Sequence, residues 1–194
     1  LGTFIPDGLR ETTRKPIPVE VIRDIQKTCM NMDDDLRWLI ALLSDTGMRL
    51  GEAVGLLKSD IILDTDTPHL NLIPHPWRRL KTSGSERKIP LVGASLWSAR
   101  RVKQSDTANQ FAFPRYCNEQ THNSNSASAA LNKWLRTHAP EGCVVHSFRH
   151  SMRDRLRAVE CPKEIIDRIG GWSSSDVGES YGDGFSLSNL YDWC

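Results

Sequence analysis

Apolar residues recur at helical spacing through the first quarter of the chain. The first set, which predicts a helix beginning near Pro18, is Val21, Ile22 and Ile25. Three aspartates at positions 33 to 35 can cap a second helix, whose apolar residues are Leu36, Leu39, Ile40 and Leu43. Gly47 is placed to end that helix, since glycine tolerates the left-handed backbone found just past many helices. A short third helix is expected from Leu50 to about Leu57.

From residue 61 the pattern changes to short apolar runs separated by turn residues, which is typical of strands. These runs cover residues 61–63, 70–73 and 87–91. Helical spacing then returns over residues 94–103, 126–138, 147–159 and 163–169. The pattern therefore predicts an α+β domain that is mainly helical and carries one small antiparallel sheet of three strands.

Composition narrows the class of protein. The chain has 194 residues, enough for one domain, and no apolar run approaches the roughly 18 residues of a membrane span. Five scattered cysteines without a CxxC pair favour reduced thiols in a cytoplasm over disulfides or a zinc ribbon. They are Cys29, Cys117, Cys143, Cys161 and Cys194. Because the net charge is only +1, any nucleic-acid binding must come from local clusters.

Two such basic clusters are present. The first, with a single acid at Glu86, is Arg78, Arg79, Lys81, Arg87 and Lys88. The second lies on one predicted helix with two histidines and is Arg149, Arg153, Arg155 and Arg157. Taken alone, each cluster is explained equally well as a solvated face.

Three segments carry candidate chemistry. Arg49 stands just before a predicted helix with Glu52 three residues on, which by itself is an ordinary helix start with an ion pair. His146 and His150 lie one turn apart, but no glutamate follows the first histidine, so the zinc-protease pattern does not match and we expect no metal site. Tyr181 alone would be read as a half-buried packing residue.

Taken together and in order, these segments resemble the catalytic domain of the tyrosine recombinase (phage-type integrase) family. The matching motifs are Thr46-Gly47-Met48-Arg49-Leu50-Gly51-Glu52, His146-Ser147-Phe148-Arg149-His150, Gly171-Trp172 and Tyr181. Lys81, in a hairpin turn before Pro90-Leu91, matches a further element, and the resemblance runs from Pro16 to the tyrosine. Trp172 replaces the usual histidine, and the long stretch from Arg49 to Lys81 leaves Lys88 as an alternative lysine.

The resemblance implies a role for each matching residue. Arg49 and Arg149 would clamp the phosphate, and Tyr181 would attack it, giving a 3′-phosphotyrosine link without a metal or cofactor. His146 would take the proton of the tyrosine or steady the phosphate, Lys81 would protonate the leaving oxygen, and Trp172 would donate a hydrogen bond. Glu52 and His150 would support these groups. The residues expected to contact DNA are Arg78, Arg79, Arg87, Lys88 and Arg153.

The resemblance also implies an organisation. We expect residues 1–16 to be a linker from an N-terminal core-binding domain, residues 17–182 to be the catalytic domain, and residues 183–194 to be a tail exchanged between protomers. The expected partner is double-stranded DNA, bound by a homotetramer that is weakly associated or monomeric without it, with accessory DNA-bending proteins and no membrane. The expected setting is a bacterial cytoplasm, at the nucleoid.

The expected function is site-specific recombination that integrates or excises a mobile element. Two alternatives stay open. One is an enzyme of related chemistry, such as a type IB topoisomerase or a telomere resolvase. The other is a relative that binds DNA but has lost catalysis.

Overall fold

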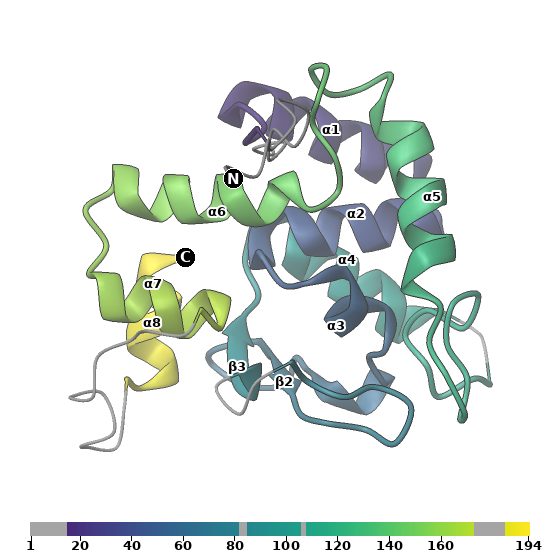
Figure 1. Ribbon diagram of the computed structural model, residues 1–194. Coiled ribbons are helices and arrows are strands. Elements are labelled where there is room, and N and C mark those ends of the chain that lie inside the picture. The colour runs from purple at the N-terminus through teal and green to yellow at the C-terminus, as the bar shows by residue number, and fades with distance from the viewer. Residues whose placement is uncertain (1–14, 82–84, 106–107, 173–184) are drawn as a thin grey trace, which may run out of the picture.

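The computed structural model describes residues 15–81, 85–105, 108–172 and 185–194 (Figure 1). Within these ranges the chain is mainly helical with a small three-stranded antiparallel sheet, as the sequence predicts. The helices are α1 (Val19–Met32), α2 (Asp35–Thr46), α3 (Leu50–Val54), α4 (Gly93–Gln104), α5 (Ser124–Leu135), α6 (Ser147–Ala158), α7 (Lys163–Gly170) and α8 (Leu187–Trp193), with a 3₁₀ turn η1 at Lys58–Asp60. The strands are β1 (Ile61–Ile62), β2 (His69–Leu72) and β3 (Arg87–Pro90).

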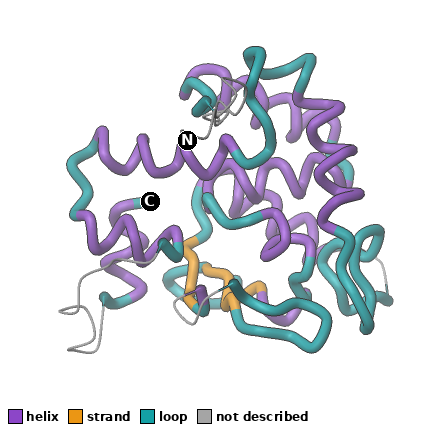
Figure 2. Tube along the Cα trace, in the orientation of Figure 1, coloured by secondary structure: helices purple, strands orange, loops and turns teal. Residues whose placement is uncertain are grey.

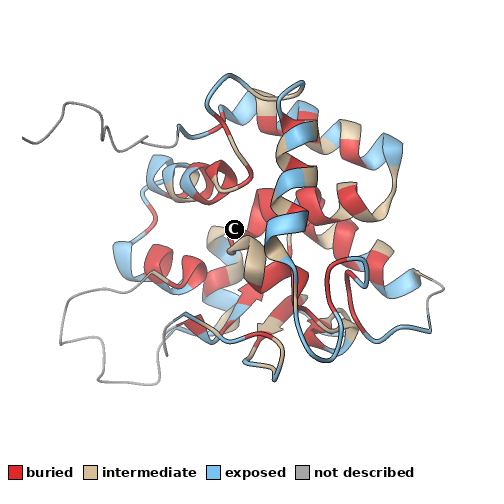
Figure 3. Ribbon diagram, turned by 45° about the vertical axis from the view of Figure 1, so that its right-hand side comes forward, coloured by how far each residue is buried: buried red, intermediate tan, exposed pale blue. Residues whose placement is uncertain are grey.

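Helix α2 lies at the centre of the domain, against α1, α4 and α6 (Figure 1). Most of its residues are buried, and Figure 3 shows in red how the buried residues gather in the interior of the domain. The ends of α2 follow the local signals in the sequence. The Asp34 carboxylate accepts a hydrogen bond from the backbone N–H of Arg37 at 3.0 Å, and Gly47 ends the helix at φ 59°. Asp33 instead ends α1 in the left-handed conformation. This arrangement delivers the chain from the core directly into the Arg49 turn.

The sheet has the order β1-β2-β3, with Leu70 paired to Ile61 on one side and to Ile89 on the other (orange in Figure 2). Helix α3 ends at Val54, earlier than the predicted Leu57. The reason is that the backbone carbonyl of Leu56 accepts a hydrogen bond from Ala112 at 2.9 Å, which draws the chain away from the helical path.

Helix α5 is displaced toward the N-terminus from the predicted 126–138. Asn123 caps it by accepting from the backbone N–H of Ser126 at 2.9 Å, so the helix begins at Ser124. Past Leu135 the backbone tightens, because His138 bonds to the Leu135 carbonyl, three residues back.

Two separate clusters of buried apolar side chains form the core. The larger one is built by α1 to α5 and the sheet, and it includes Phe148 from the first turn of α6. The smaller one joins the rest of α6 to α7 and α8, and its buried residues are Met152, Leu156, Cys161, Ile165, Ile166, Ile169 and Leu190. Helix α6 therefore spans both clusters (Figure 1).

The C-terminal tail contains a helix that the hydrophobic pattern did not predict. Ser186 caps α8 by accepting from the backbone N–H of Asn189 at 3.2 Å. Leu190 is 3% exposed, and Trp193 packs against the smaller cluster of the same chain. In the described ranges no helix is long and apolar enough to cross a bilayer. All five cysteines are free thiols.

Candidate active site

Glu52 is the anchor of a cluster of arginines between α3, β3 and the start of α6. One of its carboxylate oxygens accepts from Arg49 Nη1 at 2.7 Å. The other accepts from the backbone N–H of Arg49 at 2.9 Å and from Arg87 Nη2 at 3.1 Å. Since Glu52 is 5% exposed, it fixes two guanidinium groups in a site largely closed to water.

Arg149 enters the same site from the first turn of α6. Its Nη1 donates to the backbone carbonyls of Gly47 at 2.8 Å and Gly170 at 2.6 Å. Its Nη2 is buried and has no hydrogen-bond partner among the described residues. A buried donor of this kind costs free energy unless it meets an acceptor.

The charges in the cluster are unbalanced. Three guanidinium groups, those of Arg49, Arg87 and Arg149, face one carboxylate. Burial, together with the neighbouring charges of Arg49 and Arg87, lowers the pKa of Arg149 to about 9. Burial alone would raise the pKa of Glu52, but the Arg87 and Arg49 guanidinium groups hold it below its ordinary value. The site therefore has an excess of positive charge suited to a phosphate.

The turn after α7 closes one side of this cluster. Gly171 has φ 61°, and a Cβ added there would lie 2.6 Å from Arg87 Nη1. A Cβ on Gly170 would lie 1.7 Å from an atom of the Trp172 ring, so the ring packs directly against the glycine. The Arg149 guanidinium group makes a cation–π contact with the same ring, with 4.2 Å between the guanidinium carbon and the ring centre.

A family model described as the phage integrase family matches residues 16–183. The chain belongs to the phage integrase family. The comparison with curated protein sequences gives no match.

Solved structures of tyrosine recombinases share the fold of this integrase-family chain. The Tn1549 transposon integrase, in complex with circular intermediate DNA, is 18% identical with a TM-score of 0.62, over 96% of this chain and 63% of that one. XerH recombinase in a pre-cleavage complex with its difH substrate is 15% identical with a TM-score of 0.61, over 100% of this chain and 54% of that one. XerA recombinase is 14% identical with a TM-score of 0.59, over 98% and 61%. The chain thus spans less than two thirds of the length of these relatives.

Of the predicted site residues, the structure brings Arg49, Glu52, Arg149 and Trp172 together. His146 is at the N-terminal end of α6, one turn before Arg149, and its ring meets His150 edge-on at 5.2 Å between centroids. Three or more histidine, cysteine or acidic side chains placed to hold a metal ion are not found in the described parts of the chain.

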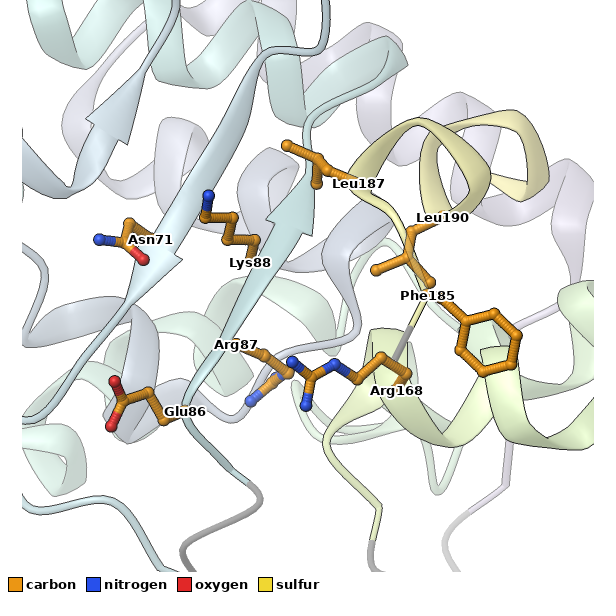
Figure 4. A pocket seen from close by; sticks show the side chains of 8 residues that line it. All are labelled: Asn71, Glu86, Arg87, Lys88, Arg168, Phe185, Leu187 and Leu190. Atoms are coloured by element: carbon orange, nitrogen blue, oxygen red, sulfur yellow. The ribbon is translucent and has the colours of Figure 1, made fainter. Parts of the chain in front are cut away.

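The other two expected catalytic residues are Lys81 and Tyr181. Lys81 is exposed and lies in the connection between β2 and β3. Ser85 lies at the other end of that connection, and its hydroxyl oxygen accepts a hydrogen bond from Arg49 Nη1 at 3.4 Å. Tyr181 lies outside the described residues. Lys88, the alternative lysine, is exposed and lines a pocket between β3 and α8 with Asn71 and Arg168 (Figure 4).

The five arginines and lysines expected to contact DNA differ in how far they are buried. Arg79 and Lys88 are exposed, and Arg153 is partly exposed and lies 3.8 Å from Asp167. Arg78 is 1% exposed and donates to the backbone carbonyls of Glu52 and Ile73. This burial does not fit the prediction of a DNA contact, because Arg78 fills the space beside Gly55 instead.

Arg87 likewise does not fit the expected DNA contact, and it is the member of the cluster that sequence reasoning misplaced. Its side chain is fully buried and paired with Glu52. The alternation of β3 carried a usable signal: Ile89 and Leu91 are core residues, so Arg87 shares their inward direction and Lys88 faces outward.

Proposed function

We propose that this chain is the catalytic domain of a site-specific DNA recombinase that cuts and rejoins strands through a 3′-phosphotyrosine link to Tyr181. The observation that carries the proposal is the buried, unpartnered Nη2 of Arg149 in a cluster with excess positive charge. Membership of the phage integrase family supports the same chemistry.

The chemistry follows from the charges that develop on phosphorus. Attack by the Tyr181 oxygen forms a P–O bond and breaks the bond to the 5′-oxygen, while negative charge gathers on the two non-bridging oxygens. Arg49 and Arg149 stabilise that charge with groups already fixed in place. His146 takes the phenol proton, and Lys81 gives a proton to the leaving 5′-oxygen. The phosphodiester energy is conserved in the tyrosine link, so the reverse attack reseals the strand.

We propose double-stranded DNA as the partner. The Tn1549 integrase and XerH were solved in complex with DNA, which supports this assignment. Exposed Arg79 and Lys88 are available to neighbouring phosphates. A homotetramer on two DNA sites, accessory DNA-bending proteins and a bacterial mobile element complete the proposal, with residues 1–16 linking to a core-binding domain.

We also propose that the C-terminal tail is exchanged between protomers in that tetramer. The tail offers Leu190 and Trp193, which pack on the smaller cluster of their own chain here. Exchange would transfer the same apolar contacts to a neighbour at little cost. Deleting residues 183–194 should then abolish pairing of DNA sites, and pairing that survives the deletion would remove this part of the proposal.

The test of the chemistry is a nicked suicide duplex made from the junctions flanking the gene. The wild-type chain should form a protein–DNA adduct that resists denaturation, and Tyr181→Phe should form none. Arg149→Met should bind the duplex but give an adduct at least about a hundredfold more slowly, since one charged clamp is worth about 3 kcal/mol in such sites.

Each other result has a definite meaning. An adduct that persists in Tyr181→Phe would transfer the nucleophile to another residue, with Tyr191 tested next. DNA binding without any adduct would leave a binding protein that no longer cuts. Relaxation of supercoiled DNA by a monomer, without strand exchange, would indicate a topoisomerase-like enzyme.

A further inference from the structure

Arg87 is a charged side chain with no exposed surface that joins three separate segments of the site. It lies at the start of β3, immediately after the hairpin that carries Lys81. Its guanidinium group uses each of its three nitrogens for a different partner. Burying a charge so completely is costly unless it is paired and hydrogen-bonded, and here it is both.

The first partner is Glu52. Arg87 Nη2 lies 3.1 Å from one carboxylate oxygen, and Arg49 Nη1 lies 2.7 Å from the other. The carboxylate therefore bridges the two guanidinium groups. Because Arg49 is the more exposed of the two, Arg87 supplies the buried side of this bridge.

The other two partners are backbone carbonyls. Arg87 Nη1 donates to Ser85 at 2.7 Å, which fixes the base of the hairpin. Arg87 Nε donates to Ile169 at 2.9 Å, in the last turn of α7. The guanidinium group also lies against Gly171, where a Cβ would come within 2.6 Å of Nη1. The turn that presents Trp172 is thus packed directly on this side chain.

We propose that Arg87 is a positioning residue for strand cleavage, holding Ser85, at the end of the β2–β3 connection, and the Gly170–Trp172 turn in register with Arg49. This inference rests on the proposed recombinase function. Its physical basis is the planar fork of arginine, which donates in three directions at once. A lysine has one ammonium group on a flexible stem and cannot reach Glu52 and both carbonyls from one position.

The experiment compares Arg87→Lys with a matched control, Arg100→Lys, in single-turnover adduct formation on the nicked suicide duplex. Arg100 is an exposed residue of α4, so the same substitution there keeps the charge and does not touch the junction. At saturating DNA, Arg87→Lys should lower the rate constant at least tenfold and leave the DNA dissociation constant within twofold. Arg100→Lys should leave the rate constant within twofold.

The rate constant separates positioning from folding. A loss of folded protein lowers the amplitude of adduct formation but not its rate constant. Residues that act as a unit are not additive, so Glu52→Gln combined with Arg87→Lys should be no slower than the slower single variant. The Glu52→Gln single variant keeps Arg87 intact, so it can still be measured if Arg87→Lys fails to fold.

Two results would overturn the inference alone: a wild-type rate constant for Arg87→Lys, or a loss that appears only in DNA affinity or in amplitude. Additive losses for Glu52→Gln and Arg87→Lys would also overturn it. If the wild-type chain forms no adduct, the proposed function itself fails, and the role of Arg87 falls with it.

Discussion

The guanidinium groups of Arg149 and Arg153, one turn apart on α6, both face the ring of Trp172, at 4.2 and 5.2 Å from its centre. The Trp172 ring therefore contacts both cationic groups. In the family the residue here is usually a histidine, whereas this chain uses a large aromatic face that attracts cations. We therefore expect Trp172 to orient Arg149.

Replacing the tryptophan tests this role of the ring. Trp172→Leu removes the aromatic face and should slow adduct formation by about tenfold, since a desolvated cation–π contact is worth about 1–2 kcal/mol. Trp172→Phe keeps a ring without the indole N–H and should lose less. Single-turnover rates on the suicide duplex measure both variants. Equal losses would instead mean that the N–H, and not the ring face, is what matters.

The glycine turn gives a prediction about stability. Gly171→Ala places a Cβ in a left-handed backbone and against buried Arg87, whereas Gly142→Ala meets only the flexible end of Lys15 at 3.9 Å. Gly142→Ala should cost about 1–2 kcal/mol from the backbone alone. Gly171→Ala should cost about 1–3 kcal/mol more because of overpacking. Denaturant unfolding of the two variants measures the difference. Equal losses of unfolding free energy would mean that the Arg87 side chain moves aside without cost.

A pH dependence follows from the pKa of about 9 for Arg149. As pH rises through that value, the free chain loses the charge that meets the phosphate, so the rate at low DNA concentration should fall. Bound phosphate favours the charged form, and the fall should therefore move to higher pH when DNA is saturating. Rates measured from pH 7 to 10 at both DNA concentrations test this, and a fall at the same pH in both would contradict it.

Stability should change in the opposite sense. The folded-state pKa of Arg149 lies well below its ordinary value, so above pH 9 the unfolded chain binds more protons than the folded one. The cost of burying this charge is present below pH 9 and relieved as pH rises further. Relative to Arg149→Met, the wild-type chain should gain unfolding free energy between pH 9 and 10. Groups that titrate equally in both chains cancel in this difference.

Features fixed by neighbours in the sequence could be predicted, whereas features fixed by distant contacts could not. Asp34 and Gly47 bound α2 through neighbours in the chain, so its ends could be predicted. Helix α8 could not, because a seven-residue segment of this composition is stabilised by the burial of Leu190 and not by its own propensity. Likewise Glu52 was predicted from its spacing to Arg49, whereas its second partner, Arg87, stands 35 residues away in the sequence.

A buried carboxylate away from the site gives a further prediction. Asp45 accepts from Gln26 Nε2 and the Ala94 backbone N–H, both at 2.9 Å, and from Arg155 Nη1 at 3.0 Å, and so ties three helices to α2. Asp45→Asn replaces one accepting carboxylate oxygen with an amide nitrogen, which cannot accept. The change should cost about 1.5–3 kcal/mol of unfolding free energy.

The matched control is Asp24→Asn on α1. Asp24 pairs with Lys27 at 3.5 Å, with both side chains 76% exposed, so this change should stay within about 0.5 kcal/mol. Thermal or denaturant unfolding compares the two variants. Similar costs for both would show that the helices do not depend on the Asp45 contacts.

Helix α6 spans two hydrophobic clusters, and the arginine site lies where they meet. Arg149 and Phe148 are in its first turn, and Phe148 belongs to the larger cluster. Gly170 ends α7, and Trp172, just after it, packs against the smaller cluster. Local unfolding need not involve the whole domain, and small clusters open first. If α7 and α8 open as a unit, Arg149 loses its Gly170 acceptor and its aromatic cover while the pairing of Arg49 with Glu52 persists. The chain would then be inactive but still largely folded.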